Sequence, residues 1–454
     1  MFDKLEKALL PMASAIGTNK YLTAIRDGFL ISTPLLMAGS AFLLLANLPI
    51  PGWNDFLTSI TIGNSTLAAF LEKPSDATFT LMAIFATMGI AYSYARLIDS
   101  DKIFCAANAL MAWFMLMPYS VSGTVEVAGQ SVDATLAGLP LTWVGSRGIF
   151  VGIFCAFAAT AIYTWAKNRG WVIRMPEGVP PTVVDSFSSI IPILVTMGVF
   201  FFINLIFGAF GTDAFTIVFT FLQVPLLNLG DTLGAMVIAY IFLHLFWFFG
   251  INGGAVVGAV FNPILQTLSM ENLEYFRTGV GQGHIICQQF QDFFATFGGC
   301  GSTLSLIIAM LIFCKSARIK QLSKLALIPG IFNINEPIVF GLPIVMNPVM
   351  LIPFILVPTL NIVISYIAMA LGLVPICNGI QLPWTCPLGI SGFVATNWAG
   401  GLLQILLLIL GVFVYLPFIK AVDNQYLEEE RLASEAAHAE EDDIDLDNVS
   451  FDDL

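Results

Sequence analysis

Charged side chains are scarce in this chain of 454 residues. They make up 11% of it, whereas about 25% is usual for a soluble domain. With so few charges a soluble fold would leave its surface largely apolar, which disfavours a soluble enzyme, a nucleic-acid binder and a disordered scaffold. Hydrophobic residues form 57% of the chain. Their runs reach the roughly 20 residues that a spanning helix needs and lack the alternation of barrel strands. The composition predicts an all-α polytopic membrane protein.

Motifs for cofactors and metals are also missing. The sequence contains no phosphate-binding P-loop, no GxSxG elbow and no HExxH pair. Its 7 cysteines form no CxxC pair, and its 3 histidines are scattered. We therefore expect no cofactor and no metal, and we interpret the cysteines as small apolar residues.

The net charge of −13 comes mostly from one end of the chain. Residues 428–454 hold 12 acids and one base, Arg431, which leaves 17 bases and 19 acids elsewhere, a net of −2. The nearly neutral body offers no basic patch for nucleic acid. We expect 423–454 to be an acidic disordered tail, either solubilising or interacting, whose removal from residue 428 onward leaves folding intact.

Apolar segments long enough to cross a membrane recur along the chain. Nine are continuous: 28–48, 78–94, 103–121, 148–165, 190–210, 233–249, 299–314, 349–373 and 402–418. Three more are interrupted by Gly, Pro or Asn: 251–270, 325–346 and 374–394. Broken segments of this kind tend to line cavities, because their freed backbone groups need polar neighbours.

Basic residues orient these segments. They gather at 4–26, at 315–324 and at Lys420, and we place all three on the cytoplasmic side. For successive loops to alternate between the two sides of the membrane, the chain then needs ten crossings. Segment 251–270 is the tenth crossing, and 325–346 and 374–394 are re-entrant hairpins. Both termini are predicted to be cytoplasmic. Residues 1–27 read as an amphipathic helix on the membrane surface.

Glu336 is the strongest candidate for a functional side chain. It lies in the apolar run GIFNINEPIVFGLP, flanked by Asn333, Asn335 and Pro337. A carboxylate at membrane depth is costly, and such groups are normally paired, protonated or turned toward a watery cavity. We expect Glu336 to bind a polar solute with help from the two asparagines, the alternative being a surface carboxylate near the headgroups. Uncharged polar groups around one carboxylate suit a sugar better than an ion or a lipid.

Three further stretches are weaker candidates. The Gly-rich segment 247–262 offers Asn252, although glycines here also suit helix packing. Trp384 is equally suited to stacking on a sugar and to an interfacial aromatic belt. His284 and Asp292 precede the turn 298–303, GGCGST, where polar loop residues without a special role are the competing interpretation.

The chain resembles, over about residues 1–422, the membrane IIC components of sugar phosphotransferase systems, in the lactose/cellobiose/diacetylchitobiose family. The segments that carry the resemblance are LEKALLPMASAIG, NRGWVIRMPEGVPPTVVDSFSSIIP, FGGCGSTLSL, NEPIVFGLPIVMNP and PWTCPLGISG. The resemblance implies a homodimer with ten membrane helices and two re-entrant hairpins in the bacterial inner membrane. It divides the chain into 1–27, a dimer-forming domain 28–211, an amphipathic connection 212–232, a sugar-binding domain 233–422 and the tail 423–454.

The resemblance also implies a function. The chain would bind a β-linked disaccharide or a β-glucoside outside and present it inside to a IIB protein. The IIB protein carries the phosphocysteine and receives its phosphoryl group through HPr and IIA. Glu336 would contact the hydroxyl to be phosphorylated, and Trp384 would lie near the sugar. Asn252 stands where chitobiose-type members have histidine; it cannot act as a base, which places proton transfer on Glu336. An ion- or proton-coupled sugar transporter and a non-transporting sugar sensor are the alternatives.

Overall fold

The computed structural model describes residues 19–46, 52–127, 130–176, 178–250, 252–342, 344 and 347–442. The chain forms two compact units. The first unit comprises Met1–Ala239, Asn252–Gln291 and Pro375–Pro383, and the second comprises Tyr240–Ile251, Asp292–Val374 and Trp384–Leu454. This division differs from the expected boundary at 212–232, because two later segments join the N-terminal half.

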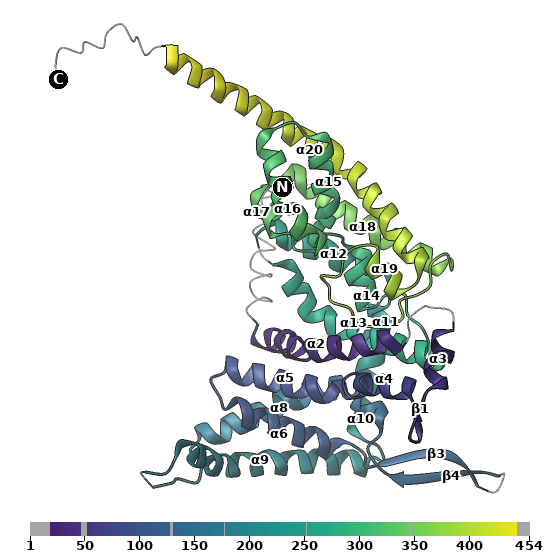
Figure 1. Ribbon diagram of the computed structural model, residues 1–454. Coiled ribbons are helices and arrows are strands. Elements are labelled where there is room, and N and C mark those ends of the chain that lie inside the picture. The colour runs from purple at the N-terminus through teal and green to yellow at the C-terminus, as the bar shows by residue number, and fades with distance from the viewer. Residues whose placement is uncertain are drawn as a thin grey trace. The chain divides into compact units, whose positions relative to one another are not determined.

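Helices make up most of the first unit. They are α2 (Lys20–Ala46), α3 (Trp53–Ser59), α4 (Leu67–Asp76), α5 (Met82–Leu97), α6 (Lys102–Leu116), α7 (Leu141–Val144), η1 (Ser146–Gly148), α8 (Ile149–Asn168), α9 (Pro181–Ala209), α10 (Ala214–Val218), η2 (Phe219–Gln223), α11 (Val224–Gly230), the start of α12 (Leu233–Phe248), α13 (Gly253–Thr278) and α14 (Gln288–Phe290). Figure 1 shows α2, α5, the pair α6 and α8, and α9 in successive layers. Between them lies a buried core that includes Trp113 and Phe200.

Glycine allows α2 and α5 to cross closely. A Cβ on Gly28 would lie 2.5 Å from the backbone N of Ile90, and a Cβ on Gly89 would lie 2.5 Å from the carbonyl O of Gly28. Small residues at such crossings let two helix backbones approach, which is how apolar helices gain packing contacts in a membrane.

The fold is predominantly helical, as expected, but two antiparallel strand pairs depart from the all-α prediction. Strands β3 (Ser120–Val127) and β4 (Gln130–Ala137) form an antiparallel hairpin that pairs Ser120 with Ala137 and Val127 with Gln130. A two-residue pair, β1 (Thr61–Ile62) with β2 (Ser65–Thr66), lies in the preceding loop. β3 contains three valines and a threonine, residues that favour strands, and most of the hairpin lies between the apolar runs 103–121 and 148–165.

The second unit is built around one long helix. Its elements are the end of α12, η3 (Gln291–Ala295, from residue 292), η4 (Cys300–Ser302), α15 (Thr303–Phe313), α16 (Ala317–Ile331), α17 (Glu336–Gly341), α18 (Pro348–Ala370), α19 (Ile390–Ala395) and α20 (Trp398–Asp442). Helices α15, α18 and α19 all pack against α20 (Figure 1). The long irregular segment between α18 and α19 contains Trp384.

The prediction of a disordered tail from residue 423 is wrong as far as Asp442, because α20 continues to that residue. Asp423 is 3% exposed and accepts hydrogen bonds from the backbone N–H groups of Lys315 and Ser316. Glu430 accepts one from the Ser316 hydroxyl at 2.7 Å and others from the N–H groups of Ala317 and Arg318. Two acids of the supposed tail therefore satisfy the free N–H groups at the start of α16. Residues 443–454 lie outside the described residues.

Six helical segments of the described chain are long and apolar enough to cross a membrane. They are Ile149–Asn168, Pro181–Ala209, Gly253–Thr278, Gln288–Phe313, Pro348–Ala370 and Trp398–Glu435. A seventh results if Ala214–Gly230 and Leu233–Phe248, bent by 75°, count as one. α5 and α6 are shorter, at 16 and 15 residues. Ten crossings and the two hairpins remain predictions, and of the helix expected at 1–27, residues 1–18 lie outside the described residues while 20–27 open α2.

Candidate functional site

Two asparagines join three segments of the second unit near Glu336. Asn333 accepts a hydrogen bond from the N–H of Gly298 at 2.7 Å and donates to the carbonyl of Trp384 at 2.6 Å. Asn335 donates to the carbonyl of Cys300 at 2.8 Å. The loop 332–336 is thereby fixed to the 298–300 turn and to the Trp384 segment, although these are 35 to 51 residues apart.

The glycine turn beside this loop is packed too tightly for side chains. Gly299 has a φ of +84°, and a Cβ there would lie 2.7 Å from the carbonyl O of Asn333. Gly301 has a φ of +80°, and a Cβ there would lie 2.1 Å from two ring carbons of Phe354. The motif GGCGST therefore supplies a close backbone approach to the Asn333 loop, not a set of polar ligands.

His244 holds the same turn from α12. Its Nε2 accepts the N–H of Gly301 at 2.8 Å, so the proton is on Nδ1, which donates to the carbonyl of Tyr240 at 2.6 Å. The hydroxyl of Tyr415 donates to the carbonyl of Gly301 at 2.5 Å. Both backbone groups of Gly301 are thus satisfied by fully buried side chains.

Two further buried amides, Asn361 and Gln404, hold the same region, and neither is among the residues predicted from the sequence. The frame of the site consists of Asn333, Asn335, His244, Tyr415, Asn361 and Gln404. Asn361 donates to the carbonyl of Ala295 and to the hydroxyl of Ser302. Gln404 donates to the carbonyl of Phe293 at 2.6 Å and accepts from the N–H of Gly389 at 2.6 Å. The signal was present, because a polar side chain inside an apolar span is buried only with a partner.

Glu336 itself is exposed at the first turn of α17. Within the described chain its carboxylate makes no hydrogen bond and no ion pair. The indole of Trp384 is 54% exposed, and its carbonyl is bound by Asn333. Asp292 is half-buried in η3. The frame therefore fixes the backbone around Glu336 while leaving its carboxylate and the Trp384 ring available to a ligand.

Asn252 and His284 lie in the first unit. Asn252 is the N-cap of α13, where its Oδ1 accepts the N–H of Ala255 at 2.9 Å. Asparagine is among the best residues for this position, and capping gives Asn252 a structural role.

His284 joins two carboxylates of the first unit. Its Nδ1 lies 2.9 Å from Asp231 and its Nε2 lies 2.9 Å from Glu271. Burial lowers the pKa of His284, but its hydrogen bonds to Asp231 and Glu271 and their negative charges outweigh this and raise the pKa to about 9. His284 is therefore an imidazolium that neutralises acids at the α11–α12 bend and on α13.

The cysteines form no disulfide in the described chain, which includes all 7 of them. Each is buried or half-buried. Across the described ranges, no group of three or more His, Cys, Asp or Glu side chains is arranged to hold a metal ion.

Comparison with known proteins agrees with the helical architecture. Residues 26–358 match the family described as Phosphotransferase system, EIIC. The chain is 37% identical to the oligo-beta-mannoside-specific EIIC component of Bacillus subtilis (strain 168), over 95% of this chain and 96% of that protein. It is 40% identical to the cellobiose-specific EIIC component of Geobacillus stearothermophilus, over 94% of this chain and 95% of that protein.

A solved structure is similar over nearly the whole chain. It is the crystal structure of the transporter ChbC, the IIC component from the N,N'-diacetylchitobiose-specific phosphotransferase system. The TM-score is 0.89 at 38% sequence identity, covering 94% of this chain and 99% of ChbC. A polytopic helical membrane protein with these matches is a sugar permease. The chain belongs to the EIIC family of the phosphotransferase system.

Proposed function

We propose that the chain binds a β-linked disaccharide or a β-glucoside through Glu336 and presents it for phosphorylation by a phosphocysteine IIB protein. The observation that carries the proposal is the Glu336 carboxylate, which is exposed and unpaired in the described chain, while the two asparagines that precede it, Asn333 and Asn335, are fixed by hydrogen bonds. A carboxylate held in this way can accept a hydrogen bond from a sugar hydroxyl and assist its deprotonation.

The sugar class is supported by the relatives. Their names refer to oligo-beta-mannoside, cellobiose and N,N'-diacetylchitobiose, all β-linked sugars. The half-exposed Trp384 ring suits the C–H face of such a sugar. The donor is assigned to a separate IIB protein, since a phosphocysteine needs an accessible thiol of low pKa and no cysteine here is exposed. A homodimer with both termini cytoplasmic completes the proposal.

Glu336→Gln separates binding from chemistry. Glutamine keeps the shape and one carbonyl acceptor but removes the charge. Hydrogen bonds to charged groups contribute about 1.5–3 kcal/mol and neutral ones about 0.5–1.5. Sugar binding should weaken by about 1–2 kcal/mol, or roughly ten-fold, while single-turnover phosphorylation by phospho-IIB should fall by a further ~10²–10⁴-fold.

Glu429→Gln is the matched control, because Glu429 is an exposed glutamate on α20 of the same unit. It should leave both measurements at wild-type values. Equal losses in both measurements for Glu336→Gln would mean that Glu336 only binds the sugar. Wild-type values in both measurements would place Glu336 outside the site. In a separate experiment, sugar uptake into vesicles that lack every phosphotransferase protein would favour a coupled transporter instead.

A further inference from the structure

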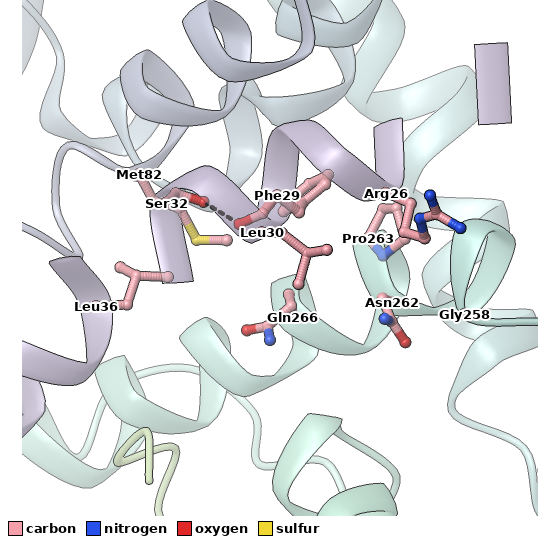
Figure 2. A pocket seen from close by; sticks show the side chains of 10 residues that line it. All are labelled: Arg26, Phe29, Leu30, Ser32, Leu36, Met82, Gly258, Asn262, Pro263 and Gln266. Carbon is pink, nitrogen blue, oxygen red and sulfur yellow. Dashed lines mark hydrogen bonds between the residues drawn. The ribbon is translucent and has the colours of Figure 1, made fainter. Parts of the chain in front are cut away.

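A small cavity of about 60 Å³ lies within the first unit, between α2, α5 and α13 (Figure 2). Its lining is Arg26, Phe29, Leu30, Ser32, Leu36, Met82, Gly258, Asn262, Pro263 and Gln266. None of these residues belongs to the Glu336 loop or to its frame, so the occupancy of the cavity is testable separately from transport.

The cavity has one apolar wall and one polar wall. Phe29 and Leu30 from α2 and Met82 from α5 supply hydrocarbon. Asn262 and Gln266 are four residues apart on α13, which places both amides on the same helix face. Figure 2 shows these two amides on α13, opposite the side chains carried by α2. The one lining hydroxyl, on Ser32, is already used, because it donates to the carbonyl of Phe29.

Both amides leave an oxygen without a partner. Asn262 Oδ1 and Gln266 Oε1 are buried, and neither has a hydrogen bond within the described chain. An unsatisfied buried polar atom costs about 1–3 kcal/mol. Two such atoms, one helical turn apart on the wall of one cavity, indicate a bound donor. Exchanging N and O of either amide would place an N–H there instead, and a hydroxyl, which both donates and accepts, satisfies either arrangement.

Charge and size restrict the ligand. Two buried carbonyl oxygens favour a neutral hydroxyl donor. The Arg26 guanidinium is already paired with Asp27 at 2.7 Å, a carboxylate that also pairs with Arg96. The cavity volume of about 60 Å³ exceeds the roughly 10–15 Å³ that one water molecule needs on this measure, so the cavity can hold water molecules or the hydroxyl groups of a small polyol.

Gly258 keeps the polar wall open. It lies one turn before Asn262, and a Cβ there would approach Asn262 Nδ2 to 3.0 Å and Oδ1 to 3.2 Å. Any side chain at position 258 would therefore crowd the Asn262 amide.

We propose that this cavity is a binding site for O–H donors, supplied either by water or by the diol end of a small polyol. The donors bridge Asn262 and Gln266, and the carbon atoms of a polyol rest on the Phe29, Leu30 and Met82 wall. Occupancy fills the space between α2 and α13 and stabilises the packing of these helices in the first unit.

The first test is the sign of a stability change in the purified full-length protein. Asn262→Leu and Gln266→Met replace each amide by an apolar side chain of similar size. If a donor satisfies the oxygens, each change should raise the equilibrium constant of unfolding by about 2- to 13-fold, which corresponds to one lost hydrogen bond. If the cavity is empty, the same changes remove an unsatisfied oxygen and leave stability equal or higher, which overturns the proposal. Asn424→Leu, on an exposed part of α20, controls for the gain of apolar surface.

The second test identifies the donor. Ethylene glycol and 1,2-dimethoxyethane share a carbon–oxygen skeleton, but only the first has O–H groups. Ethylene glycol should raise the Tm of the wild type saturably, and 1,2-dimethoxyethane should not. If Asn262→Leu and the milder Gly258→Ala lose the saturable increase in Tm with ethylene glycol, the cavity is a polyol site. Destabilised variants without any ethylene glycol response identify water as the donor, and equal responses to both probes contradict recognition of O–H groups.

Discussion

Replacing Asp423 by asparagine tests whether α20 anchors the start of α16. The carboxylate is 3% exposed and accepts the N–H groups of Lys315 at 2.9 Å and Ser316 at 2.9 Å. Asparagine keeps one acceptor oxygen and turns an NH2 group toward the second N–H. One charge-assisted hydrogen bond, of about 1.5–3 kcal/mol, is then lost, and the other weakens by about 1 kcal/mol. We expect the free energy of unfolding to fall by about 2.5–4 kcal/mol.

Denaturation of the purified protein in mixed micelles, followed by tryptophan fluorescence, measures this change. Glu435→Gln is the control on the same helix, because Glu435 is exposed and lies 3.6 Å from Arg431 in a surface pair that contributes about 1 kcal/mol at most. Amide hydrogen exchange should become faster at Lys315 and Ser316 in Asp423→Asn alone. A variant with wild-type stability and wild-type exchange would refute the anchoring role of Asp423.

Further predictions concern the tail, pH, helix packing and topology. Deleting 436–454 should leave stability unchanged, whereas deleting 428–454 removes Glu430 and should lower it, as a paired denaturation experiment will show. The folded-state pKa of His284 is raised from 6.5 to about 9, so the stability that protonated His284 contributes is complete below about pH 6.5 and is lost as the pH rises through 9. In His284→Gln, the free energy of unfolding measured from pH 6 to 10 should therefore depend less on pH. Gly89→Val should lower the Tm, because its side chain meets the Gly28 carbonyl, and an unchanged Tm would contradict the close crossing. A cysteine introduced at Leu5 or Glu440 should react with a membrane-impermeant maleimide only from the cytoplasmic side, and labelling from outside would exclude ten crossings.

Residues 428–442 show where a composition argument fails. Twelve acids with few apolar neighbours predict disorder. Glu430 is nevertheless part of α20, and its carboxylate binds Ser316, which lies 114 residues earlier in the chain. Composition describes how a segment behaves alone, and it contains no information about free N–H groups that another helix presents.

The candidate site divides in the same way. Glu336 stands out in the sequence because a carboxylate in an apolar run needs a reason to be there, and that reason is local. Asn333 and Asn335 were expected to contact the sugar, but their amides bind the backbone of Gly298, Trp384 and Cys300. The sequence could not predict that these asparagines support the loop, because an amide offers the same hydrogen-bonding groups to a ligand and to the backbone.

The sequence alone determined the class of protein, since the length of an apolar run and the cost of burying a charge are properties of short segments. It also predicted correctly that 325–346 and 374–394 are broken, because Gly, Pro and Asn act on the local backbone. The same prediction is wrong for 251–270, where α13 runs without a break from Gly253 to Thr278 because Pro263 is accommodated within the helix. Only the tertiary structure decided which groups meet: Asp231 and Glu271 at His284, His244 and Tyr415 at Gly301, and Asp423 at the start of α16. The physical reason is that a hydrogen bond depends on positions within about 3 Å in space, and residues far apart in the chain reach such positions only after the helices have packed.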